Sequence, residues 1–89
     1  MNDEYDVRIE ERVLKELRAI APTERQRITA AILTLRKNPR PGNAVRLVGQ
    51  PGWRIRIGNY RVLYEIDDAA RKVTIYRAGH RSDVYKMRE

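Results

Sequence analysis

The chain has 89 residues, a formal net charge of +7 at neutral pH and no cysteine. A chain of this length forms one domain with a modest core, and without cysteine it has no disulfide framework, thiolate metal site or thiol nucleophile. Its single histidine argues against a zinc centre. The N-terminal residues show neither the basic nor the apolar stretch of a signal peptide, so we expect a soluble, cytoplasmic protein.

The first half of the chain predicts a short strand followed by two amphipathic helices. Apolar and polar residues alternate over residues 5–9, which indicates the strand. Apolar residues then recur at helical spacing over 10–20 and again from Thr23 to about Lys37, with Thr23 as the expected N-cap and Gln26 as its capping-box partner. Each helix has one apolar stripe. We therefore expect an antiparallel helical hairpin that needs a sheet to cover it.

The second half predicts a loop and a three-stranded meander. Residues 38–52 are rich in proline and glycine, and Val45, Leu47 and Val48 are expected to anchor this loop in the core. Strands are expected over 53–57, 60–66 and about 72–78, with Gly58-Asn59 as the first hairpin turn. The order β-α-α-β-β-β predicts an α+β domain. Its helical hairpin packs on one face of a small, mainly antiparallel four-stranded sheet, and the other face stays open.

Positive charge is concentrated on that open face. Arg54 and Arg56 lie two residues apart in a strand, so their side chains leave the same face, and Arg61 follows just beyond the turn. Like charges on neighbouring strands repel one another, so the cluster indicates an anionic ligand, with a solvated basic face as the alternative. Residues 36–89 carry a net charge of +8 and residues 1–35 a net charge of −1. Nucleic acid or an acidic protein fits this asymmetry better than a membrane, because no long apolar run is present.

Two motifs carry a family resemblance, LVGQPGWRIRIGNYRVLYEI and the closing AGHRSDVY. With the helical hairpin before them, they make nearly the whole chain resemble the RelE/ParE superfamily of toxins, and its RelE branch in particular. The resemblance implies one RelE-like toxin domain over residues 1–89. It also implies an mRNA interferase, a ribosome-dependent endoribonuclease that cuts mRNA in the ribosomal A site. In that reaction the ribose 2′-OH attacks the adjacent phosphate, and neither a metal nor a cofactor takes part.

The resemblance also assigns partners and residues. The partners are the ribosome, mRNA and an acidic, RelB-like antitoxin that forms a hetero-oligomer with the toxin. Arg61 and Arg81 match the arginines that stabilise the transition state, and Tyr85 matches a tyrosine that stacks on or orients the nucleotide. Arg54 and Arg56 stand where many members have two lysines. Because arginine stays protonated, we assign both to phosphate and rRNA contact rather than to base catalysis.

His80 is the candidate general base, because imidazole is the side chain that changes its charge nearest neutral pH. The alternative is that His80 merely ends a strand. Gly79 breaks the strand alternation, so either His80 or Arg81 can face the site.

Two further functions compete with the nuclease. A ParE-like toxin would inhibit DNA gyrase by binding, without nuclease activity, and a noncatalytic basic module would bind RNA or an acidic protein. The set of basic residues in the two motifs favours the nuclease.

Overall fold

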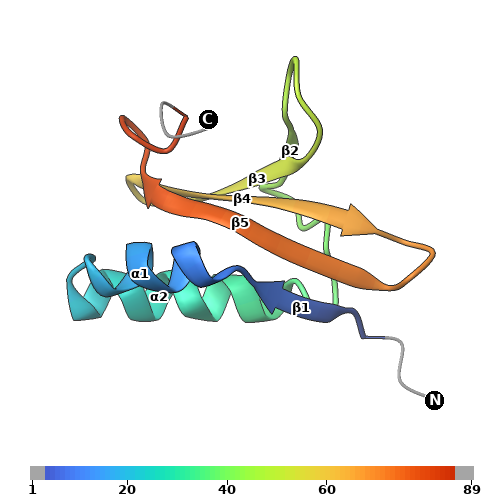
Figure 1. Cartoon of the computed structure of the whole chain (residues 1–89), viewed down its shortest axis with the longest axis horizontal. Helices are drawn as coiled ribbons and strands as arrows, with labels where there is room; N and C mark the ends of the chain where they lie inside the picture. The colour runs from blue at the N-terminus through green and yellow to red at the C-terminus, as the bar shows by residue number, and fades with distance from the viewer. Residues whose placement is uncertain (1–3, 86–89) are drawn as a thin grey trace.

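The computed structural model describes residues 4–85 and shows two helices packed on one face of a five-stranded sheet (Figure 1). The elements in chain order are β1 (Asp6–Ile9), α1 (Glu11–Arg18), α2 (Pro22–Thr34), β2 (Val45–Arg46), β3 (Trp53–Ile57), β4 (Tyr60–Asp67) and β5 (Lys72–His80). The strand order is β1-β5-β4-β3-β2, with β1 parallel to β5 and the other neighbours antiparallel. This confirms the α+β class. Within residues 4–85, neither helix is long and apolar enough to span a bilayer.

The prediction of four strands is wrong by one, because β2 lies inside the predicted loop. Val45 and Arg46 pair with Arg54 and Trp53 of β3 and form the sheet edge. Two residues are too few to show an alternating pattern, and the surrounding prolines and glycines indicate only a loop. The expected anchoring of this loop is also wrong for Val45 and Val48, which are 46% and 95% exposed. Leu47 alone of the three packs against buried residues.

The predicted cap of the second helix is wrong as well. The helix begins at Pro22, one residue before Thr23, with Ala21 at the N-cap position and no capping side chain in the described region. Proline suits this place, because its fixed φ matches the helix and its missing N–H would have no partner in the first turn.

The main core fills the space between the helices and the sheet. The helices contribute Val13, Ile28 and Ile32, the C-cap of α2 contributes Leu35, and the strands contribute Ile55, Val62, Tyr64, Val73 and Ile75, all at most 2% exposed. Burial of an aliphatic side chain of this size contributes about 1.5–3 kcal/mol. As predicted, the apolar residues of β3 face the helices, so its arginines are directed to the opposite face.

That opposite face is not fully open, contrary to the prediction. Leu63 and Tyr76 of the sheet and Val84 beyond it form a second, smaller buried cluster, against which Leu47 packs. The loop approaches closely at Gly52, where φ is 115° and a Cβ atom would lie 2.9 Å from the carbonyl oxygen of Tyr64. Two segments distant in sequence, the loop after β2 and the turn after β5, are therefore held over the same part of the sheet.

Helix α1 completes the outer edge of β5 where β1 ends. The Glu10 N–H donates to the Ile75 carbonyl at 3.1 Å, and the Ala78 N–H donates to Glu16 Oε1 at 2.9 Å. The other Glu16 oxygen forms a largely buried ion pair with Arg77 at 3.0 Å. The last residues of strand β5 are therefore held from both sides, by β4 and by α1.

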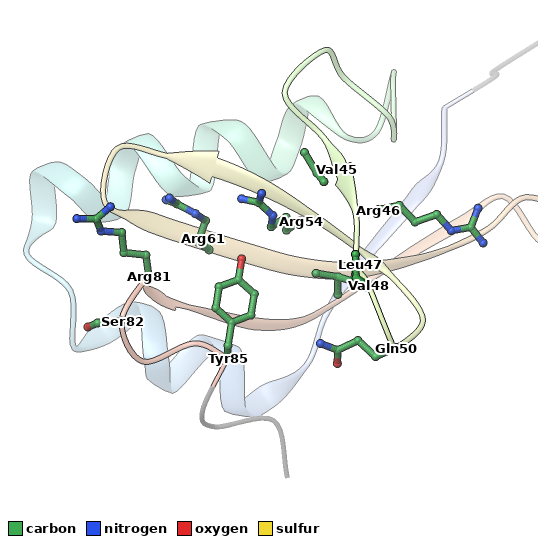
Figure 2. Close-up of a pocket in the computed structure, with 10 residues that line it drawn as sticks. All are labelled: Val45, Arg46, Leu47, Val48, Gln50, Arg54, Arg61, Arg81, Ser82 and Tyr85. Carbon is green, nitrogen blue, oxygen red and sulfur yellow. The ribbon is translucent and has the colours of Figure 1, made fainter.

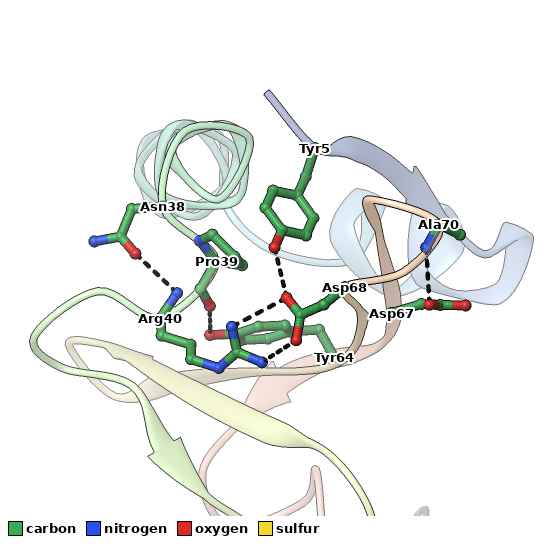
Figure 3. A network of polar contacts seen from close by, with 8 residues as sticks. All are labelled: Tyr5, Asn38, Pro39, Arg40, Tyr64, Asp67, Asp68 and Ala70. Carbon is green, nitrogen blue, oxygen red and sulfur yellow. Dashed lines mark hydrogen bonds and ion pairs between the residues drawn. The ribbon is translucent and has the colours of Figure 1, made fainter. Parts of the chain in front are cut away.

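A polar network ties the loop after α2 to the β4–β5 turn (Figure 3). Arg40 donates two hydrogen bonds to Asp68, at 2.8 and 3.3 Å, and the Tyr5 hydroxyl donates to the same carboxylate. These bonds, Arg40 first, lower the pKa of Asp68 to about 2. The buried Tyr64 hydroxyl donates to the Pro39 carbonyl at 2.7 Å, and burial raises the pKa of Tyr64 to about 12.

We expect Asp68→Asn to lower the free energy of unfolding at neutral pH, because it removes the charge that Arg40 and Tyr5 bind. The pKa of Asp68 is depressed to about 2 in the folded protein, against roughly 3.9 in an unfolded chain. Its contribution is therefore complete above about pH 4 and is lost as the pH falls towards about 2. Urea denaturation of both proteins across this range measures the difference. A difference that does not change with pH contradicts the assignment.

Candidate functional site

The β3–β4 hairpin places three arginines on the face away from the helices, as predicted. Arg56 stands directly opposite Arg61 in the strand register, and Arg54 lies two residues before Arg56 on the same face. The arrangement follows from the pleat, because Ile55 and Ile57 take the helix side. The hydrophobic pattern of β3 thus determines where its cations point.

An open groove of ≈ 630 Å³ runs over this face (Figure 2). It is lined by Val45, Arg46, Leu47, Val48, Gln50, Arg54, Arg61, Arg81, Ser82 and Tyr85. Figure 2 shows the guanidinium groups of Arg54, Arg61 and Arg81 in a row, with the Tyr85 hydroxyl pointing towards that row. The sheet forms the floor of the groove, while β2 with its following loop and the turn after β5 form the walls.

Arg61 is the central cation of the groove and is only 8% exposed. Its guanidinium donates to the carbonyls of Gly58 and Tyr60 at 3.1 and 2.9 Å, which holds it beside the turn of the hairpin. Burial lowers the pKa of Arg61, and the positive charges of neighbouring arginines, Arg54 among them, lower it further. Because a guanidinium stays protonated at physiological pH, Arg61 keeps its positive charge in an unfavourable environment. A bound anion would reduce this electrostatic cost.

Six arginines outside the groove have the anionic partners that the groove lacks. Carboxylates lie within ion-pair distance of Arg8, Arg12, Arg27, Arg36, Arg40 and Arg77. Within residues 4–85, no carboxylate forms an ion pair with Arg54, Arg56, Arg61 or Arg81. A merely solvated basic face does not require one of its cations, Arg61, to be buried beside others without a counterion. The groove therefore has the character of an anion-binding site.

The structure brings together four of the six predicted site residues, namely Arg54, Arg61, Arg81 and Tyr85. Arg56 adjoins the groove from its exposed place opposite Arg61. His80 lies elsewhere. It pairs in register with Tyr60, whose neighbours are in the helix-side core, and the two rings meet edge to face at 5.7 Å. Of the two residues after Gly79, Arg81 is therefore the one that faces the groove.

Sequence reasoning missed the apolar wall of the groove. Val45 and Val48 were expected in the core, yet they line the groove together with Tyr85. These three are among the five large apolar side chains that the described part of the chain exposes. The available signal for this wall was the presence of apolar residues inside a loop rich in proline and glycine. An apolar wall beside a row of cations suits a nucleotide, which joins an apolar base to a phosphate.

The chemistry of the groove is that of cations and hydroxyl groups. Residues 4–85 contain no group of three or more side chains that could hold a metal ion. The described residues that line the groove include no carboxylate and no imidazole. The groove can bind an anion, stabilise negative charge that develops on it and stack a ring on Tyr85.

Residues 7–85 match the family model of the ParE toxin of type II toxin–antitoxin systems, parDE. The chain belongs to this family. It is 34% identical over 86 residues to a Methanocaldococcus jannaschii protein named as a candidate toxin, RelE1, and the match covers 92% of this chain and 96% of that protein. It is also 34% identical over 88 residues to toxin RelG of Mycobacterium tuberculosis, covering 92% and 97% of the two chains.

The fold of the chain also agrees with that of a solved toxin–antitoxin complex. The crystal structure of the RelBE2 toxin–antitoxin complex of Mycobacterium tuberculosis contains a chain that superposes with a TM-score of 0.77 and 26% identity, covering 86% of this chain and 98% of that one. The predicted membership of the RelE/ParE superfamily is confirmed, and the protein is a toxin of a type II toxin–antitoxin system.

We expect inorganic pyrophosphate to raise the melting temperature of the toxin, because a ligand that binds only the folded state stabilises it. A hundredfold excess over Kd contributes about 2.7 kcal/mol. Arg54→Gln and Arg81→Gln should each weaken the effect. Arg18→Gln, which removes the same charge from the exposed surface of α1, should not. An equal loss in all three variants would indicate nonspecific charge screening and contradict a built site.

Proposed function

We propose that this toxin is a ribosome-dependent endoribonuclease that cleaves mRNA in the ribosomal A site. The observation that carries the proposal is the buried guanidinium of Arg61, surrounded by other arginines and without a carboxylate partner among residues 4–85. A phosphodiester supplies the missing negative charge. RNA also brings its own nucleophile, the 2′-OH, so the protein needs to supply only positioning and charge.

In the proposed reaction the 2′ oxygen attacks the adjacent phosphorus and the bond from phosphorus to the 5′ oxygen breaks. The products are a 2′,3′-cyclic phosphate and a free 5′-OH. Negative charge grows on the phosphate and on the leaving oxygen, where Arg61 and Arg81 stabilise it, each by about 10²–10³ in rate. The proton of the 2′-OH passes to solvent, and solvent protonates the 5′ oxygen.

The remaining groove residues hold the substrate. Tyr85 exposes 39% of its surface and lines the groove, where its ring stacks on an unpaired base. Such stacking contributes about 1–3 kcal/mol. Arg54 and Arg56 bind flanking phosphates of mRNA or rRNA, a role that needs permanent charge and no proton transfer.

The ribosome completes the site. The groove is open and has no general base among its described lining residues. It therefore relies on the ribosome to align the 2′-OH with the phosphate, and alignment of this kind is a large part of catalysis. We therefore propose that the toxin acts in the cytoplasm, where the ribosomes are.

The antitoxin performs the opposite task. We propose an acidic, RelB-like partner that gives carboxylates to the groove arginines and covers Val45 and Val48, forming a toxin–antitoxin hetero-oligomer. The RelBE2 complex supports such a partner, because its toxin shares this fold.

The match to the ParE family model favours one alternative, a toxin that inhibits DNA gyrase by binding, without nuclease activity. The arginine row and Tyr85 favour the nuclease, because binding to gyrase requires no such constellation. Two assays separate the functions. In one, the toxin is incubated with translating ribosomes and the mRNA ends are mapped, and in the other its effect on gyrase supercoiling is measured.

We expect Arg61→Ala and Arg81→Ala each to abolish growth inhibition, because a loss of about 10²-fold or more in cleavage rate exceeds what expression can offset. Arg18→Ala, on the exposed surface of α1, is the matched control and should stay toxic. Growth after induction, with protein levels measured by immunoblotting, tests this. Full toxicity of either groove variant at equal expression would remove that residue from the mechanism.

We also expect mRNA on ribosomes to be cut readily and the same RNA without ribosomes to be a poor substrate. Positioning alone can be worth about 7–11 kcal/mol in well-aligned reactions, and the free groove does not supply it. Primer extension on both substrates at matched concentrations measures the ratio. Comparable cutting of naked RNA would show that the toxin aligns its substrate unaided.

A further inference from the structure

The turn after β5 carries three groove residues, Arg81, Ser82 and Tyr85, and His80 stands just before it as the last residue of β5. The proposed reaction gives His80 no task. Its surroundings nevertheless show a specific arrangement. The ring contacts Tyr60 at the start of β4, and its Nδ1 atom faces Ser82, two residues further along the chain.

His80 contacts the turn through both its ring and its backbone. Ring Nδ1 accepts the N–H of Ser82 at 3.1 Å and lies 2.8 Å from the Ser82 hydroxyl oxygen. The His80 carbonyl accepts the N–H groups of Asp83 and Val84 at 2.9 and 3.0 Å. Substitution of His80 removes the contacts of the ring and leaves those of the backbone carbonyl. The contribution of the ring to the turn can therefore be tested separately.

These contacts leave the imidazole unsuited to base catalysis. A ring nitrogen that accepts a backbone N–H carries no proton, so in this arrangement a neutral His80 ring holds its proton on Nε2. Nδ1 is occupied by Ser82 and Nε2 already bears a proton. The ring also lies against Tyr60 on the side of the helices and does not line the groove.

Two other contacts hold the turn. The Arg81 N–H donates to the Asn59 carbonyl at 2.8 Å, which joins the turn to the β3–β4 hairpin. Val84 is 1% exposed and packs with Leu63 and Tyr76 on the groove face of the sheet. It is the one buried residue between 81 and 85. Between these contacts, the His80 ring is the side chain that orders the backbone at residue 82.

We propose that His80 is a positioning residue, whose imidazole acts as a neutral hydrogen-bond acceptor that shapes the turn and directs Arg81 and Tyr85 into the groove. The proposal replaces the catalytic role that the sequence predicts for His80. Its activity readout rests on the proposed nuclease function, and its structural readout does not.

Two substitutions distinguish positioning from base catalysis. In His80→Asn the side-chain oxygen can accept the N–H two residues further on, as asparagine does in an Asx-turn, yet the amide cannot take up a proton. In His80→Leu the side chain still packs against Tyr60 and accepts nothing. We expect single-turnover cleavage on ribosomes within about threefold of wild type for His80→Asn and slowed about 10²-fold for His80→Leu, because small misplacements of catalytic groups have effects of this size.

The loss in His80→Leu should appear in the rate constant of the chemical step, with toxin affinity for the ribosome changed little. Equal loss in both variants would indicate proton transfer by His80 and overturn the proposal. Wild-type cleavage rates in both variants would show that the His80 ring does not position the groove residues, and would also overturn the proposal.

Amide hydrogen exchange tests the turn without reference to cleavage. In an Arg61→Ala background, which allows expression if the toxin is a nuclease, the Ser82 and Val84 amides should exchange faster with His80→Leu than with His80→Asn or His80. Equal exchange in all three proteins overturns the proposal. If the wild-type toxin does not cleave mRNA, the nuclease function fails while the exchange pattern still decides the role of His80.

Discussion

A buried cation without a counterion is the physical constraint on which the rest of this structure depends. Arg61 is buried beside the turn of the β3–β4 hairpin, and the other charged residues that line the groove are arginines. Such a cluster opposes folding, so other parts of the molecule must supply the stability that holds it. It also prepares the groove for an anion, because no carboxylate among residues 4–85 has to be displaced from these arginines when a phosphate binds.

The two faces of the sheet divide these tasks. The helix side carries the main hydrophobic core. Acidic residues are used where they stabilise structure, as in the pair of Glu16 with Arg77 beside β5 and the pair of Asp68 with Arg40 at the β4–β5 turn. On the groove face the small cluster around Val84 holds both walls near the arginines. Both walls of the groove are thus packed onto the sheet although the charges in the groove repel one another.

Much of this frame could be predicted, because alternation over five or more residues determines which face each side chain takes. Strand β3 has the predicted bounds, and Arg54 and Arg56 share the predicted face. Strand β2 could not be predicted, since two residues show no period. The start of α2 was missed because Thr23 has the chemistry of a cap, while Pro22 before it fits the first turn better. The backbone of Arg81 is held by a hydrogen bond from its N–H to the Asn59 carbonyl in the β3–β4 hairpin, which no local sequence pattern reports.

The most direct test of the central claim is the chemistry of the cut ends on a ribosome-bound mRNA with one defined A-site codon. Attack by the 2′-OH, with charge stabilised by the arginine groove, predicts a 2′,3′-cyclic phosphate on one fragment and a 5′-OH on the other. It also predicts no cleavage when the nucleotide 5′ to the scissile phosphate is 2′-deoxy. A 5′-phosphate product, or cleavage of the 2′-deoxy substrate, would show that an external nucleophile is used and would contradict the mechanism derived from this groove.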